Sequence, residues 1–96
     1  MVVTVTESVL SEEQLAQVEA FLEEFLPRMR QAPGVVEILH YADRQSGTTR
    51  TVTVWEAEED AVAYRQGELV REPIAVEQRL GLSSRRSGPF EVRRLA

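Results

Sequence analysis

Several reactive side chains are missing from this sequence of 96 residues. It has no cysteine, which excludes disulfides, thiol nucleophiles and thiolate metal sites. All 11 basic residues are arginine, so a lysine Schiff base and a phosphate-binding lysine are excluded. Asparagine is absent, and His40 is the single histidine, which excludes a histidine-rich zinc or iron site within one chain. We therefore expect no metal and no organic cofactor.

Charge and hydropathy narrow the choice of partners. The formal net charge is −5, from 16 acidic and 11 basic residues, whereas a nucleic-acid binder needs a positive surface. No run approaches the ~18 apolar residues of a membrane span. Residues 1–10 have neither the basic region nor the cleavage site of a signal peptide, so we expect a cytoplasmic protein. The length is that of one domain, residues 1–96.

The hydrophobic pattern of the first third predicts a strand followed by a helix. Apolar and hydroxyl residues alternate over Val2–Glu7, which is typical of a strand. Apolar residues at helical spacing then predict a helix over 11–31, opened by a capping box from Ser11 to Gln14. Pro27 lies inside this helix, and we expect a kink or a restart there.

The remaining elements complete a β-α-β-β-α-β order. Strands are predicted over Val35–Ala42, Thr48–Glu56 and Phe90–Leu95, helices over 57–70 and 73–80, the last ended by Gly81, a hairpin turn over 43–47 and a loop over 82–88. This order predicts the ferredoxin-like α+β sandwich, a four-stranded antiparallel sheet with helices on one face.

The other face of this sheet carries apolar side chains that would be exposed to water in a single copy of the domain. The alternation in residues 35–42 places Val36, Ile38 and His40 on one face and Leu39 with Tyr41 on the other. We assign Trp55 to the same uncovered face as Leu39. A second copy of the sheet would bury these side chains, so the sequence predicts a homodimer.

Three features resemble the antibiotic biosynthesis monooxygenase-like group of the dimeric α/β-barrel superfamily. They are the order of elements, the passage APGVVEI from the first helix into the second strand, and the run VTVWEAEEDAVAYRQG. The resemblance implies a homodimer whose two sheets pack face to face as a dimeric α/β barrel, with a pocket in each subunit between sheet and helices. Haem-degrading members use Asn, Trp and His where this chain has Glu7, Tyr64 and roughly Ile74. Quinone-forming members use Trp, Tyr and Asn, of which the chain offers Trp55 and Tyr64.

Five residues are candidates for the site, each with a structural alternative. His40 and Tyr64 are the candidate catalytic residues, His40 because its ordinary pKa lies near neutrality. Trp55, Tyr41 and Phe25 are the candidate substrate-binding residues, able to stack on an aromatic ligand. The alternatives are a hydrogen-bonded strand histidine, a helix tyrosine packed by its ring, an interface or core tryptophan and a core phenylalanine.

Several charged side chains also have both a structural and a functional interpretation. Glu7 or another strand glutamate beside Arg50 predicts a cross-strand ion pair or a proton-handling pair. Arg85 and Arg86 either belong to a solvent-exposed basic loop or bind an anionic ligand. Two functions stay open: a cofactor-free monooxygenase-like enzyme acting on planar aromatic or phenolic compounds, and a non-catalytic dimeric binding or interaction module.

Overall fold

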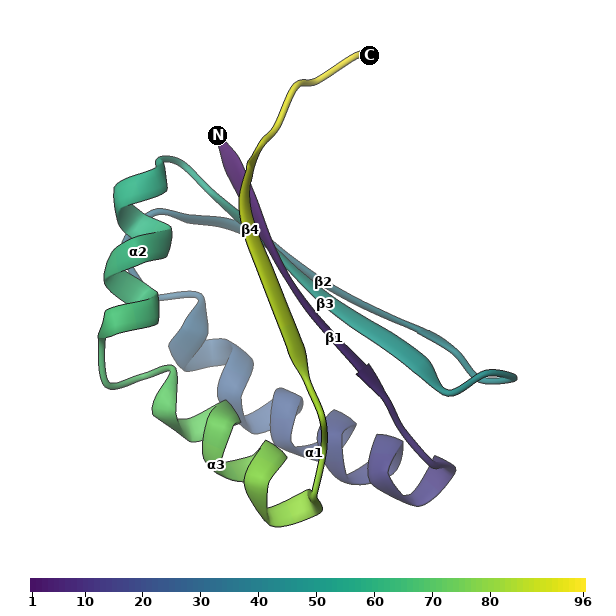
Figure 1. Cartoon of the computed structure of the whole chain (residues 1–96). Helices are drawn as coiled ribbons and strands as arrows, with labels where there is room; N and C mark the ends of the chain where they lie inside the picture. The colour runs from purple at the N-terminus through teal and green to yellow at the C-terminus, as the bar shows by residue number, and fades with distance from the viewer.

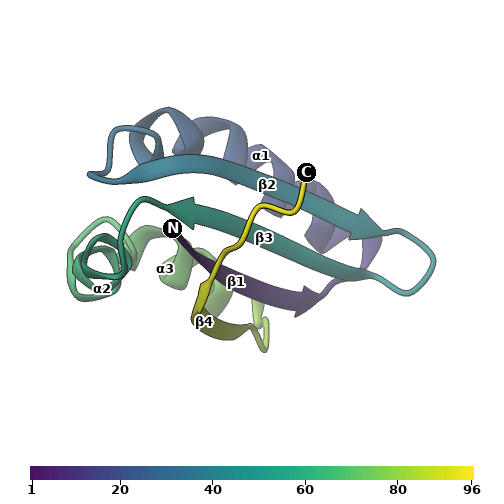
Figure 2. The same cartoon turned by 90° about the horizontal axis from the view of Figure 1, so that it is seen from above.

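The computed structural model describes all 96 residues and has seven elements. They are β1 (Val2–Val9), α1 (Glu12–Met29), β2 (Val35–Asp43), β3 (Thr48–Trp55), α2 (Glu58–Gln66), α3 (Arg71–Leu80) and β4 (Arg85–Glu91). The strands form one antiparallel sheet in the order β2-β3-β1-β4. All three helices lie on one side of this sheet (Figures 1 and 2). The ferredoxin-like α+β prediction is confirmed.

The start of α1 follows the sequence prediction, whereas its interior does not. The Ser11 hydroxyl accepts from the Gln14 backbone N–H at 3.2 Å, and the Gln14 side chain accepts from the Ser11 N–H at 3.0 Å. The predicted restart at Pro27 is wrong, because the helix continues to Met29 as one element. Pro27 lies in the last turn, where its missing N–H removes one backbone bond and little of the helix follows it.

The segment after β3 is divided earlier than the sequence predicts. α2 ends at Gln66 and α3 begins at Arg71, so the predicted helix over 57–70 is too long. Pro73 fits in the first turn of α3, where backbone N–H groups have no partner within the helix. Gly81, with φ of 69°, ends α3 in the left-handed conformation, as predicted.

The last strand is misplaced in the sequence prediction. Residues 85–88 belong to β4 instead of a loop, and the strand ends at Glu91 instead of Leu95. The sequence Gly88-Pro89 is typical of a loop, but here it lies in an irregular stretch of an edge strand, where the register to β1 shifts. Gly88 has φ of 100°, and a Cβ there would lie 2.7 Å from the Val3 carbonyl oxygen.

Trp55 lies on the helix-covered face, so its predicted place on the uncovered face is wrong. Its side chain is 1% exposed and packs with Phe25, Met29 and Ala61 in the core cluster. The alternation along β3 therefore directs Thr49, Thr51 and Thr53 toward the helices, and Val52 and Val54 away.

In β2 a register shift between Val35 and Glu37 leaves Val36 49% exposed, contrary to its predicted face. Ile38 and His40 face the helices, and Leu39 and Tyr41 face away at 51% and 50% exposure, all as predicted.

The core is small for the size of the chain. Only ten residues are buried, and the largest cluster of them lies at the Trp55 end of the sheet. The accessible surface is 6585 Å². A compact monomer of this mass exposes about 5,600 Å² by the usual scaling, so roughly 1,000 Å² of surface is in excess. Two features account for an excess of this kind: a hollow beneath the inner face of the sheet and an uncovered outer face.

Candidate functional site

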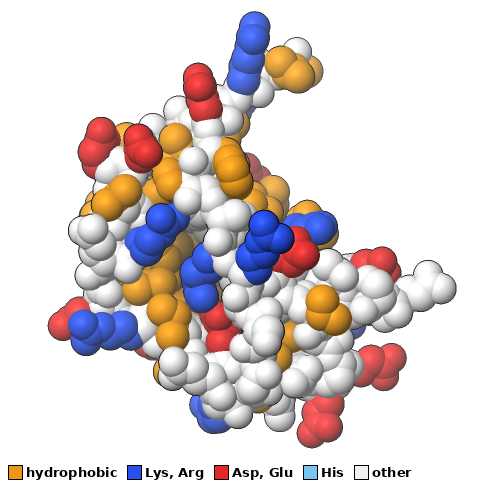
Figure 3. Space-filling model, in the orientation of Figure 1, with side chains coloured by type: hydrophobic (Ala, Val, Ile, Leu, Met, Phe, Trp, Pro, Cys, Tyr) orange, Lys and Arg blue, Asp and Glu red, His pale blue; other side chains and the backbone are white.

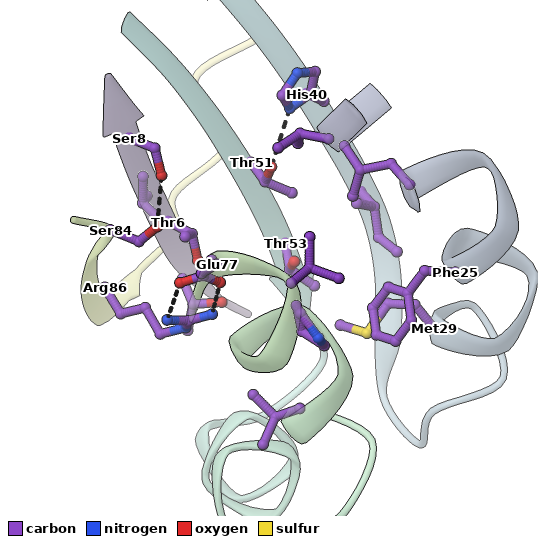
Figure 4. Close-up of a pocket in the computed structure, with 18 of the residues that line it drawn as sticks. Thr6, Ser8, Phe25, Met29, His40, Thr51, Thr53, Glu77, Ser84 and Arg86 are labelled. Carbon is purple, nitrogen blue, oxygen red and sulfur yellow. Dashed lines mark hydrogen bonds and ion pairs between the residues drawn. The ribbon is translucent and has the colours of Figure 1, made fainter. Parts of the chain in front are cut away.

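The hollow is an open cavity of about 130 Å³ between the inner face of the sheet and the helices. Its roof is apolar and comes mainly from α1 and α3, through Phe21, Leu22, Phe25, Leu26, Met29 and Val76. Figure 4 shows Phe25 and Met29 on one side of the cavity and the strands on the other. The Phe21 and Phe25 rings stack with centroids 5.1 Å apart, which gives the roof a flat aromatic wall.

Hydroxyl side chains form the floor of the cavity, which is unusual for the covered face of a sheet. They are Thr4, Thr6, Ser8, Thr49, Thr51 and Thr53. Most are engaged: Thr4 Oγ1 accepts from the Trp55 indole N–H at 3.0 Å, and the Thr49 hydroxyl donates to the Ser8 carbonyl at 3.2 Å. The hydroxyls of Thr6 and Thr53 make no hydrogen bond within the chain and are free to bind a ligand or water.

Four polar side chains lie in register across this floor, one on each strand. His40 pairs with Thr51, Thr51 with Thr6, and Thr6 with Arg86. We call these four residues the polar row. Because directly paired residues of antiparallel strands share a face, the row runs straight across the sheet beneath the apolar roof. His40 lies at one end of the drawn site and Arg86 at the other (Figure 4).

His40 is the one polar group of the site with a buried, unpaired atom. Its Nδ1 lies 3.1 Å from Thr51 Oγ1, whereas its Nε2 is buried and has no partner. Burial lowers the pKa of His40 below its ordinary value, and nearby Arg44 lowers it further, while Glu19 opposes the shift. The imidazole is therefore neutral at pH 7 and able to accept a proton.

Tyr64 lines the cavity from α2 with its ring packed on Trp55, the centroids 5.3 Å apart. Burial raises the pKa of its phenol to about 12, so the hydroxyl stays protonated and can donate. Its hydroxyl makes no hydrogen bond to another residue, so this donor is available to a ligand oxygen.

Glu77 was not singled out from the sequence, and Arg86 was considered only as part of a basic loop able to bind an anion. Arg86 extends from β4 to Glu77 on α3 in a two-pronged ion pair, with one N–O distance of 2.9 Å and a shorter second contact. Both side chains line the cavity, and that of Glu77 is only 16% exposed. The signal was hidden because Arg86 was assigned to a loop; with β4 in place, the alternation directs it inward.

The other candidate residues divide between the two faces. Phe25 lines the cavity. Trp55 lies behind the cavity wall, in contact with Tyr64, and does not line it. Tyr41 is on the outer face, where the Arg50 guanidinium lies over its ring and donates to its hydroxyl at 3.2 Å. Tyr41 is on the predicted face and does not line the cavity, so its candidate role in substrate binding finds no support in this site.

No family model matches the sequence, and no curated protein shows significant similarity to it. Solved structures match along nearly the whole chain. A Deinococcus radiodurans protein named after the antibiotic biosynthesis monooxygenases is 18% identical with a TM-score of 0.77, over 100% of this chain and 99% of that one. The chain has the antibiotic biosynthesis monooxygenase-like fold.

Two further structures share this fold. A mutant of SnoaB, a cofactor-independent oxygenase from Streptomyces nogalater, is 19% identical with a TM-score of 0.75, over 97% of this chain and 93% of that one. Rv0793 from Mycobacterium tuberculosis is 10% identical with a TM-score of 0.66, over 95% and 96%. At these sequence identities the structural similarity establishes the fold alone, and any chemistry depends on the residues of the cavity.

None of the three helices has both the length and the hydropathy needed to cross a membrane. No three side chains of the His, Cys, Asp and Glu types come together as ligands for a metal ion.

Proposed function

We propose that the protein binds a planar aromatic or phenolic compound in the cavity and oxidises it with molecular oxygen, with neither a metal nor an organic cofactor. The observation that carries this proposal is His40, which lines an apolar cavity as part of the polar row and keeps its buried Nε2 unpaired. A neutral imidazole in this place can take the proton of a phenolic hydroxyl. The shared fold with a cofactor-independent oxygenase supports the same reaction class.

The proposed reaction draws its electrons from the substrate. His40 removes a proton, and the electron-rich anion that results transfers electrons to oxygen and forms a carbon–oxygen bond. In a substrate with a ring CH2 group activated by the phenol, one oxygen atom becomes the new carbonyl and the other leaves as water, so that CH2 + O2 gives C=O + H2O. Tyr64 supplies a neutral donor able to stabilise a substrate oxygen as negative charge develops on it.

The cavity volume limits how much of a ligand is enclosed. At about 130 Å³ it approaches the ~150 Å³ of an apolar cavity that holds one benzene ring. One ring would fit between the stacked Phe21 and Phe25 and the hydroxyl floor, and the rest of a larger ligand would extend through the open mouth. Apolar side chains are visible among the arginines on the molecular surface at the β4 side (Figure 3).

We also propose that the working form is a homodimer joined through the outer face of the sheet. Apolar residues cover much of this face: Val3, Val5, Leu39, Val52, Val54 and Phe90. The surface excess of roughly 1,000 Å² is comparable to the ~800 Å² that each partner buries in a stable interface. Glu7 and Arg50 form an ion pair at 2.8 Å within this face, as the sequence predicted, and this pair would fix how the two sheets align.

Oxygen uptake in the presence of phenols, naphthols and anthrones tests the proposed activity. We expect uptake with at least one compound, and loss of that uptake in His40→Gln with a loss of ligand affinity no greater than about tenfold. The control is Val62→Ala on α2, a residue that does not line the cavity. Stabilisation by a ligand without oxygen uptake would contradict the enzyme proposal and support the non-catalytic binding module. Neither uptake nor stabilisation by any compound would contradict both.

A further inference from the structure

The contact between His40 and Thr51 decides what the buried end of the cavity can bind. Only Nδ1 of the imidazole has a partner, Thr51 Oγ1 at 3.1 Å, and Nε2 is buried without one. A neutral histidine carries one proton, on either nitrogen, and the hydrogen bond at one nitrogen selects the state of the other. If Nδ1–H donates to Thr51, Nε2 is an acceptor; if Thr51 donates to Nδ1, Nε2–H is a donor.

The polar row favours the first arrangement. An Nδ1–H that donates to Thr51 leaves the Thr51 hydroxyl proton free for water or a ligand in the cavity, which Thr51 lines. Arg86 does not impose the opposite direction, because both of its terminal nitrogens are directed at Glu77. The reverse arrangement would leave an unsatisfied N–H in an apolar cavity, and buried orphan donors are rarer in proteins than under-satisfied acceptors.

We propose that Thr51 is a positioning residue, which holds His40 in the Nδ1–H tautomer so that the buried end of the cavity accepts a hydrogen bond. A ligand that reaches Nε2 from the cavity, which His40 lines, then has to bring a hydroxyl group. A phenol satisfies Nε2, whereas a quinone carbonyl or a methyl ether at the same place leaves it unpaired. This assignment rests on the proposed function for its meaning in catalysis, but the tautomer itself can be observed without any turnover.

The single histidine makes the tautomer directly measurable. Protein labelled with ¹⁵N-histidine gives the signals of one imidazole only. At about pH 8, above the ordinary histidine pKa, we expect a protonated Nδ1 and an unprotonated Nε2. Thr51→Val keeps the β-branched shape without the hydroxyl, and we expect it to transfer population to the Nε2–H tautomer. Thr51→Ser should restore the wild-type signals, and Thr53→Val, on the same face, should leave them unchanged.

A pair of ligands tests the consequence for binding. 2-Naphthol and 2-methoxynaphthalene differ in the hydroxyl that would donate to Nε2. We expect the wild type to bind the naphthol roughly tenfold more tightly, and this preference to fall in Thr51→Val and persist in Thr51→Ser.

The possible results separate this inference from the proposed function. A protonated Nε2 in the wild type, or wild-type signals in Thr51→Val, would overturn the role of Thr51 whatever the protein catalyses. Equal affinity for the two naphthalenes would overturn the required hydroxyl. The expected tautomer together with absent oxygen uptake would uphold the positioning role and reject the oxygenase.

Discussion

Trp55 allows a quantitative test of the inner face of the sheet, because sequence and structure assign it to opposite faces. Its side chain is 1% exposed, packs against Phe25 and Met29, and donates its indole N–H to Thr4 at 3.0 Å. Truncating a buried tryptophan to alanine removes this packing and leaves a cavity, at a cost of about 3–5 kcal/mol. A domain of this length is stable by roughly 5–14 kcal/mol, so Trp55→Ala should lose a large share of its stability.

Two further substitutions give the expected order of effects. Trp55→Phe keeps an aromatic ring beside Tyr64 but removes the hydrogen bond to Thr4 and some volume, so we expect a loss of about 1–2 kcal/mol. Val62→Ala alters a side chain on α2 that is 37% exposed, and it should change stability by less than about 0.5 kcal/mol. The control matters because it is an apolar truncation on a neighbouring element outside the core.

Urea unfolding followed by far-ultraviolet circular dichroism measures these free energies. The protein concentration has to be equal for all variants, since self-association makes the midpoint depend on concentration. A loss below about 1 kcal/mol in Trp55→Ala would refute the placement of Trp55 in the core. Trp55 is also the only tryptophan, so its fluorescence in the wild type should be shielded from a soluble quencher until the chain unfolds.

Three other predictions address His40, the ion pair at the far end of the polar row and the outer face. The lowered pKa of His40 means that the folded state resists protonation, so stability is full above pH 6.5 and falls as the pH drops below it; His40→Gln should flatten this fall in melting temperatures measured between about pH 5 and 8. Glu77→Gln and Arg86→Gln should each cost about 1–2 kcal/mol in urea unfolding, and the double variant less than their sum. Light scattering should give twice 10.9 kDa for the wild type and 10.9 kDa for Val52→Asp; a wild-type mass of 10.9 kDa would contradict the dimer.

Helices and strands with a clear hydrophobic periodicity could be predicted from the sequence. Strands that form only because a neighbouring strand pairs with them could not. The capping box at Ser11 and the alternation over β1 are local signals, and both appear in the structure. β4 is not a local signal, because Gly88 and Pro89 are typical of a loop. They become part of a strand only because β1 offers a partner and the irregular register accepts them at the sheet edge.

A residue of the candidate site could be predicted only where the sequence also predicts which face of its strand points toward the helices. The position of His40 beside Ile38 on the inner face follows from alternation within β2, and the structure has it there. The same rule gives two possible faces for β3, and Trp55 was assigned from the sequence to the uncovered one. The structure instead places threonines inside, because their hydroxyls can be hydrated or hydrogen-bonded in a wide cavity. The valines lie outside, where a second sheet would bury them. The inward position of Arg86 was not predicted, because residues 85–88 were assigned to a loop instead of β4.

The two faces of the sheet carry neighbouring rows with different roles. The row of His40, Thr51 and Thr6 faces the cavity, and the next residues along the same strands, Tyr41, Arg50 and Glu7, form a hydrogen-bonded row on the outer face. A slip of one residue in register would exchange the two rows. A partner that buries the outer row therefore also fixes the register that aligns His40 with Thr51. For this reason we expect Val52→Asp, which disrupts the outer face, to weaken ligand binding in a cavity that it does not touch.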